Sequence, residues 1–272
     1  MNKDLIAIIV EGESYEKGII KNIEKVFPLG RQIYEVFTLP AGQNIYMLWK
    51  KMKEDEFETD IIEVLRDSCK SLERELSPFT RDSFSEVYLF FDYDAHQQNL
   101  ESGIDADEVL VEMLESFDNE TENGKLYISY PMAEAIRDFI PETCKAFSGD
   151  CFINFQVTGY KRKSTYKEDG TASKTQAISK YNHDVWVNVL TCFVERLNCL
   201  RNDEQRLSMI ECKKYTPIDV FRLQQSVILS EECLMILSAF PEFIIDYFKE
   251  EYLSNFINTR EIDLIKCDKN DK

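Results

Sequence analysis

Acidic residues directly follow two apolar segments of this chain, and their positions could support metal-dependent chemistry. Residues 5–10 are rich in Ile and Val and end at Glu11, while residues 87–91 end at Asp92, with Asp94 two positions later. If the two segments are neighbouring strands of one parallel sheet, their carboxylates meet at the edge where ligands bind in open α/β sheets. Carboxylate oxygens are ligands that Mg²⁺ prefers, and a divalent ion would neutralise the converging charges.

The segments around these acids predict an α/β fold. Apolar runs typical of strands alternate with helical patterns through residue 140, which favours a Rossmann-like parallel sheet. The predicted strands are 5–10, 33–39, 86–91 and 125–129, the predicted helices are 15–26 and 106–117, and a helical insertion covers about 44–80. Pro131 is predicted in the first turn of a further helix that carries Glu134.

The chain changes character near residue 150, so we predict a metal-binding α/β domain over 1–150 and a second region over 151–272. That region is expected to have a short strand at 151–157 and helices at about 176–200, 217–238 and 241–257. The helices beyond 185 are predicted to form core or a dimer interface, which makes a homodimer the expected assembly.

A basic and aromatic segment lies between residues 160 and 180, which hold six basic and two acidic residues. Lys161, Arg162 and Lys163 could bind phosphates, and Tyr166 could stack on a base. Lys163 is the candidate for stabilising charge on a reacting phosphate. The plain alternative is a soluble loop without a substrate role.

Composition limits the possible functions. The 272 residues include 50 acidic and 32 basic ones, so the net charge of −18 is unsuited to holding nucleic acid by a general positive field. A polyanionic substrate would need a local basic patch, bound metal or a partner. Without a long apolar segment or a signal peptide, we expect a cytoplasmic protein that does not enter the membrane.

The Glu-Gly pair at residues 11–12 and the Asp-x-Asp motif at 92–94 resemble the motifs of the TOPRIM domain. This domain is shared by topoisomerases, bacterial primases and OLD-type nucleases. The resemblance implies that Glu11, Asp92 and Asp94 hold one or two Mg²⁺ ions, or Mn²⁺, at a nucleic-acid phosphate, and that the same residues are catalytic.

Three further residues resemble the nuclease branch of that family. Glu16 matches the second acid on the first helix of OLD-like nucleases, and Ser129 and Glu134 match a serine and a glutamate near their second metal. The resemblance therefore implies metal-binding roles for all three. Each also has a plain alternative: Glu16 as an acid favoured by the helix dipole, and the other two as a turn and a solvated helix face.

The length and helical tail resemble stand-alone TOPRIM effectors of anti-phage defence, of which the TOPRIM subunit of PARIS-type systems is nearest. The resemblance implies a toxic, abortive-infection nuclease that cleaves RNA, tRNA or DNA beside an ABC-type ATPase. No GxxxxGK[ST] motif occurs in this chain, so ATP hydrolysis would come from the partner.

Two other functions remain open. Residues 91–94 also resemble the nucleophile motif of haloacid dehalogenase-like phosphohydrolases, although His96 stands where that motif has Thr or Val. A non-catalytic interaction subunit of a defence complex is the second alternative.

Overall fold

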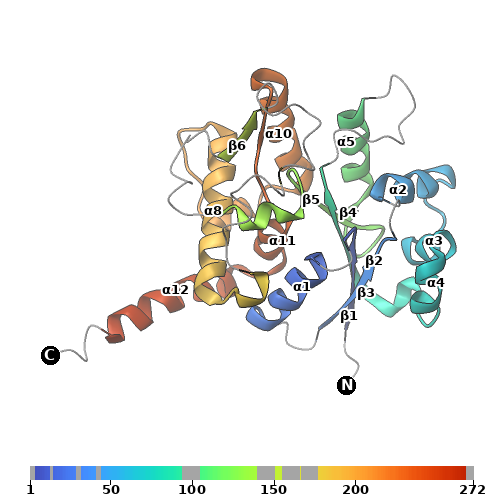
Figure 1. Ribbon diagram of the computed structural model, residues 1–272, viewed down its shortest axis with the longest axis horizontal. Coiled ribbons are helices and arrows are strands. Elements are labelled where there is room, and N and C mark those ends of the chain that lie inside the picture. Colours follow the sequence, from blue (N-terminus) through green and yellow to red (C-terminus); the bar gives the residue numbers. More distant parts are fainter. Residues whose placement is uncertain are drawn as a thin grey trace.

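A five-stranded sheet forms the centre of the protein in the computed structural model (Figure 1). The structure describes residues 4–12, 15–28, 32–40, 44–93, 105–139, 151–154, 166 and 177–267, with side chains up to residue 259. The strand order is β2-β1-β3-β5-β4, and every neighbouring pair is parallel except β4 with β5. The strands are β1 (Leu5–Val10), β2 (Ile33–Thr38), β3 (Phe84–Asp92), β4 (Asp118–Asn119) and β5 (Gly124–Ser129).

The central strands are buried on both faces, as their continuous apolar sequences predict. Residues 6–10 of β1 have no exposed surface, and residues 87–91 of β3 are almost completely buried. Buried parallel strands need a helical layer on each face, because an apolar face left open would contact water. The predicted α/β class with a mostly parallel sheet is confirmed, and it is compatible with a Rossmann-like fold.

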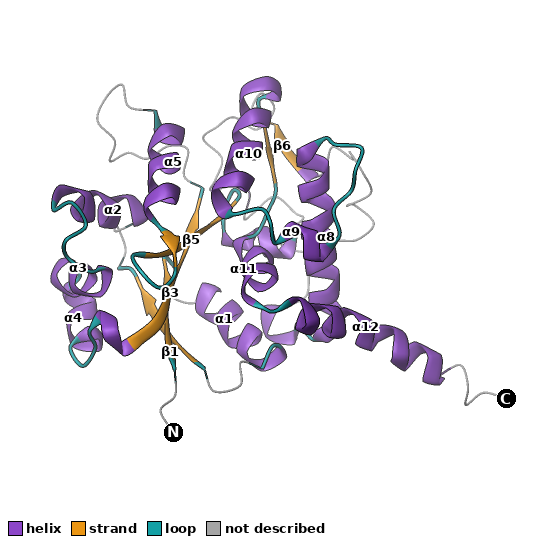
Figure 2. Cartoon of the chain, turned by 180° about the vertical axis from the view of Figure 1, so that it is seen from behind, coloured by secondary structure: helices purple, strands orange, loops and turns teal. Residues whose placement is uncertain are grey.

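Helices cover both faces of the sheet, and the two views agree on their sides (Figures 1 and 2). On one face, Phe90 of β3 stacks on Phe240 of α11 with ring centroids 4.9 Å apart. On the other, the Tyr93 hydroxyl donates a hydrogen bond to Asp107 of α5. The first layer contains α1 (Tyr15–Val26), α8 (His183–Arg201) and α11 (Ala239–Tyr247), and the second contains α2 (Ile45–Glu54), α3 (Ile61–Ser68), α4 (Lys70–Leu76) and α5 (Ala106–Ser116).

The remaining elements lie around these layers. α10 contacts α5, α8 and β5, and therefore closes the structure beyond the β5 side of the sheet. α12 extends away from the body in both views (Figure 2). These elements are η1 (Arg81–Ser83), η2 (Ala133–Arg137), β6 (Phe152–Asn154), η4 (Ile178–Lys180), α9 (Met209–Cys212), α10 (Pro217–Glu231), β7 (Cys233–Met235) and α12 (Glu250–Cys267). Among the residues that the structure describes, no helix is long and apolar enough to cross a membrane.

Three local predictions are wrong. The helix predicted over 241–257 is interrupted, because α11 ends at Tyr247 and α12 begins at Glu250. Pro131 lies before η2 and not in its first turn, and its peptide bond with Tyr130 is cis. The helix predicted over 217–238 ends at residue 231, because Glu232 adopts a left-handed conformation that stops α10. The apolar residues that follow form β7, which pairs antiparallel with β6.

The boundary predicted near residue 150 borders a stretch outside the described residues. The later helices nevertheless pack on the central sheet, since α11 lies directly against β5. Their aromatic residues join the same hydrophobic core as the strands.

Candidate functional site

The acids of interest lie where the connections of the sheet change direction. From β1 the chain leads to the neighbouring strand β2 on one side, whereas from β3 it leads toward β5 on the other side. The two connections therefore diverge between β1 and β3, and in open α/β sheets ligands bind outside the carboxyl ends of the strands at such a point. Glu11 is the first residue after β1, and Asp92 is the last residue of β3.

The strand register brings these two acids to one edge of the sheet. β1 and β3 are parallel neighbours, and Val10 pairs with Phe90. Continuing that register by one position sets Glu11 level with Phe91, one residue before Asp92. The two acids thus lie on adjacent chains within about one residue rise, roughly 3.3 Å, of each other along the strand direction.

Two more acids join Asp92 at this edge. Glu16, in the first turn of α1, and Glu134, in η2 after β5, are both buried. Burial is the main reason why the pKa of Glu16 is raised, and the negative charges of Asp92 and Glu134 raise it further. Backbone N–H groups of Glu16 and Gly12 oppose the rise. Glu16 therefore lies close to two like charges, and we call Glu16, Asp92 and Glu134 the carboxyl-edge cluster.

Gly12 makes room for this cluster. A Cβ atom at this position would lie 2.0 Å from Oε2 of Glu16 and 2.5 Å from its Cδ. No side chain fits at such distances, so the Glu16 carboxylate occupies the space above the Gly12 backbone. The Glu-Gly pair of the sequence thus has a steric reason in this fold: the glycine allows the acid of the next helix to fold back over the end of β1.

Backbone hydrogen bonds hold the side chains at the ends of β3 and β5. Asp92 pairs with Ser129 in the register, and Oδ1 of Asp92 accepts a hydrogen bond of 2.8 Å from the Ala133 N–H. Oγ of Ser129 accepts one of 3.2 Å from the Ala239 N–H, which links β5 to the first residue of α11. Ser129 lies at the predicted edge, but its hydroxyl oxygen has a structural role there.

Residues that the sequence analysis did not single out surround the cluster. The guanidinium carbon of Arg137 lies 5.1 Å from the centre of the Tyr15 ring, a cation–π contact beside Glu16 and Glu134. Burial raises the pKa of Tyr15, the charge of Arg137 opposes the rise, and Glu134 and Glu16 add to it. Arg137 follows Glu134 by one turn, and this spacing was the only sign of it in the sequence.

A buried ion pair lies immediately after η2. Nη2 of Arg196 is 3.3 Å from Oδ1 of Asp138, and both side chains are 4% exposed. Nη1 of Arg196 donates a 2.7 Å hydrogen bond to the Ile236 carbonyl, so this arginine ties η2 to α8 and to the segment after β7. The hydroxyl of Tyr166 donates to the other oxygen of Asp138 at 3.3 Å.

Tyr166 connects the predicted basic segment to this region. Burial raises the pKa of Tyr166, and Tyr15 is close enough to contribute to the rise. Tyr166 therefore packs near the carboxyl-edge cluster, with its hydroxyl bonded to Asp138. The other predicted phosphate-binding residues, Lys161, Arg162 and Lys163, lie outside the described residues.

The predicted metal ligands are thus partly brought together. Glu11, Asp92, Ser129 and Glu134 lie at one edge and Glu16 reaches it from α1, whereas Asp94 is not among the described residues. Within the described ranges, no three histidine, cysteine, aspartate or glutamate side chains are arranged to hold a metal ion. Comparisons of the chain with family models, curated proteins and solved structures gave no significant match.

Proposed function

We propose that this protein is a Mg²⁺-dependent nuclease of the TOPRIM kind, which hydrolyses phosphodiester bonds of RNA, tRNA or DNA. One observation carries the proposal: acids from separate elements converge at the switch point between β1 and β3. Carboxylates from separate elements at such an edge offer the oxygen donors that a hard divalent cation binds.

The side chains have the donor chemistry that a hard divalent cation prefers. Glu11, Asp92 and Glu16 offer only oxygen donors, and Glu134 adds a fourth carboxylate beside Glu16. Asp94 follows Asp92 by two residues and would complete the set. A bound Mg²⁺ or Mn²⁺ ion would neutralise the phosphate charge and lower the pKa of a coordinated water.

The chain's own groups have separate tasks in this proposal. The Asp92 carboxylate is oriented by the Ala133 N–H, which donates to its Oδ1. Ser129 supports the site by holding α11 against β5. Lys161, Arg162 and Lys163 would contact the nucleic-acid phosphates, with Lys163 stabilising the charge of the reacting phosphate.

The resemblance extends the proposal to a toxic effector of an abortive-infection system, acting in the cytoplasm beside a separate ABC-type ATPase. A strongly acidic enzyme is repelled by free nucleic acid, so a partner that delivers or reorients it would control its activity. A homodimer is part of the same proposal.

The test is cleavage of total RNA and of plasmid DNA by purified protein with Mg²⁺ or Mn²⁺. We expect Glu11→Ala and Asp92→Asn to lower cleavage at least about 100-fold, because each removes charge that would hold the ion. Asp118→Asn, an exposed change on β4 at the other end of the sheet, serves as the matched control. Undiminished cleavage by Glu11→Ala would contradict the proposal.

A second measurement does not depend on activity. Mn²⁺ titrated calorimetrically should bind the wild-type protein and the Asp118→Asn variant, and bind Asp92→Asn much more weakly. Equal binding by all three would show that the carboxyl-edge cluster is not the metal site. A phosphorylated Asp92 without nucleic-acid cleavage would instead indicate a phosphohydrolase.

A further inference from the structure

A cavity lies at the amino-terminal edge of the sheet, opposite the carboxyl-edge cluster. It has a volume of about 520 Å³ and is lined by the first residues of β3 and β5, the turn before β5, and the segment that joins α11 to α12. The cavity shares no lining residue with the carboxyl-edge cluster, so a ligand bound there would not occupy the proposed nuclease site.

One wall of this cavity is a continuous row of aromatic rings. The ring centres of Tyr88 and Tyr247 are 5.9 Å apart, those of Tyr247 and Phe248 are 5.0 Å apart, and those of Phe248 and Tyr252 are 4.6 Å apart. The hydroxyl of Tyr247 donates to the side chain of Gln32, which fixes the ring at the rim. These four side chains give the cavity an aromatic lining.

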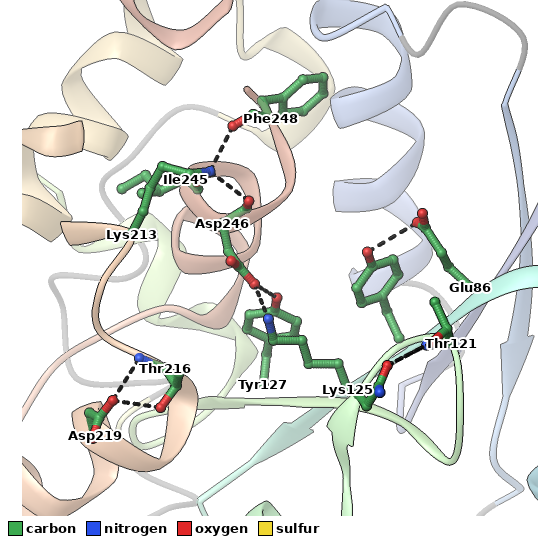
Figure 3. A network of polar contacts seen from close by, with 12 residues as sticks. Glu86, Thr121, Lys125, Tyr127, Lys213, Thr216, Asp219, Ile245, Asp246 and Phe248 are labelled. Atoms are coloured by element: carbon green, nitrogen blue, oxygen red, sulfur yellow. Dashed lines mark hydrogen bonds and ion pairs between the residues drawn. The ribbon is translucent and has the colours of Figure 1, made fainter. Parts of the chain in front are cut away.

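The lysines near the centre of this region are already engaged (Figure 3). Nζ of Lys125 forms an ion pair with Oδ2 of Asp246, which also accepts a 2.5 Å hydrogen bond from the Tyr127 hydroxyl. Nζ of Lys213 donates to the carbonyl oxygens of Ile245, Asp246 and Phe248, at 2.7, 2.7 and 2.8 Å. Lys213 therefore closes the carboxyl end of α11, and neither lysine is available to neutralise other acids of the cavity.

The acids on the other side of the cavity repel each other. Glu86 accepts a 3.0 Å hydrogen bond from the Tyr88 hydroxyl, as Figure 3 shows. Burial raises the pKa of Glu86, the hydrogen bond from Tyr88 opposes the rise, and the negative charges of Glu120 and Asp4 raise it further. Lys249 also lines the cavity, but its side chain is exposed.

Hydrogen bonds to the Glu120 carbonyl fix the position of this residue. Its carbonyl oxygen accepts hydrogen bonds from the Val87 N–H at 2.8 Å and from Nη2 of Arg81 at 3.1 Å. Nε of Arg81 binds the Glu122 carbonyl at 2.9 Å, so the turn before β5 is held against the start of β3. Glu86 and Glu120 are thus kept near each other by backbone contacts, despite their like charges.

We propose that this cavity binds a small organic cation, whose ammonium or guanidinium group lies between Glu86 and Glu120. Both carboxylates accept hydrogen bonds from the cation, and its alkyl stem lies along the row Tyr88–Tyr247–Phe248–Tyr252. The ligand class is an alkylamine or alkylguanidine, because an ammonium or guanidinium group matches paired acids beside aromatic faces. An anion is excluded from this position by the two carboxylates.

Calorimetric titration with agmatine tests the proposal, and N-butylurea serves as a neutral probe of similar size. Glu86→Gln/Glu120→Gln should weaken agmatine binding about tenfold or more, which corresponds to the loss of charge-assisted hydrogen bonds. The control variant Glu73→Gln/Glu75→Gln removes two exposed charges on α4 and should leave the affinity within about twofold. N-butylurea should not bind.

Equal weakening by both double variants would overturn the proposal, because agmatine would then respond only to the net charge of the protein. Tyr252→Leu, at the outer end of the aromatic row, is the second variant and should weaken agmatine about threefold through the lost ring. Unchanged affinity in Tyr252→Leu and in Glu120→Gln alone would likewise overturn it. Tighter binding of a capped arginine tripeptide than of agmatine would assign the site to a protein side chain and contradict the small-molecule ligand.

Discussion

Acids in two regions of the protein, the β5–α11 seam and the carboxyl edge of the sheet, have different electrostatic surroundings. At the seam between β5 and α11, Asp246 is neutralised by Lys125 and accepts a hydrogen bond from Tyr127. At the carboxyl edge, Glu16 faces Asp92 and Glu134, and its pKa is raised by both. The same residue types thus form a structural contact in one region and a mutually repelling cluster in the other.

The comparison separates acids that are paired for stability from acids that are grouped at the proposed site. Asp138 sharpens it, because this residue lies only four positions after Glu134 and yet is paired with Arg196. Asp138 therefore has its counter-charge close to the carboxyl-edge cluster. In the proposed function the cluster belongs to the site, whereas the pairing of Asp138 and Asp246 belongs to stability.

The largest expected effect on stability comes from breaking the pair at Asp138. Arg196→Met leaves a buried carboxylate without its counter-charge and should lower the free energy of unfolding by about 3–5 kcal/mol. Arg222→Met is the matched control, because the Arg222–Glu115 pair has a similar distance of 3.2 Å but side chains that are 56% and 57% exposed. Its loss should cost less than about 1 kcal/mol in urea unfolding. Equal costs would contradict the assignment of Asp138 as a structural acid.

An intermediate effect comes from making the same substitution in both regions. Asp246→Asn removes the partner of Lys125 and should cost about 1 kcal/mol, a modest value because the two side chains are 32% and 15% exposed. Asp92→Asn should leave stability unchanged or slightly higher, since its Oδ1 can still accept from Ala133 and one repulsion on Glu16 disappears. Urea unfolding of the two variants side by side measures the difference. A larger loss of unfolding free energy in Asp92→Asn than in Asp246→Asn would contradict the contrast between the two regions.

The parts of this picture that depend on local sequence could be predicted. The apolar run before Glu11 and the one before Asp92 are strands, as short runs rich in β-branched and aromatic residues predict. That these strands are neighbours was a condition of the predicted site, and the strand order meets it. The helix that begins at Tyr15 follows from its amphipathic pattern.

The features that depend on contacts between distant residues could not be predicted from the sequence. Asp138 and Arg196 are 58 residues apart, and nothing in either neighbourhood specifies the other. The Ser129 hydroxyl resembles a site residue, but its partner Ala239 lies 110 residues away. The end of α10 at Glu232 was missed because tertiary pairing of β7 with β6 overrides a helical pattern.

The smallest expected effect is the pH dependence contributed by Glu16. Because its pKa is raised in the folded protein, the folded state retains a proton that the unfolded state has already lost. Stability therefore falls as pH rises from the ordinary pKa of glutamate to the raised one, and the loss persists above it. Glu16→Gln should remove this pH-dependent loss. The free energy of unfolding of the variant should exceed that of the wild type by up to about 1 kcal/mol near neutral pH and should equal it in acid. Unfolding in urea across this pH range measures it. A gain that is the same at every pH would mean that packing, and not the repulsion by Asp92 and Glu134, sets the stability of this edge.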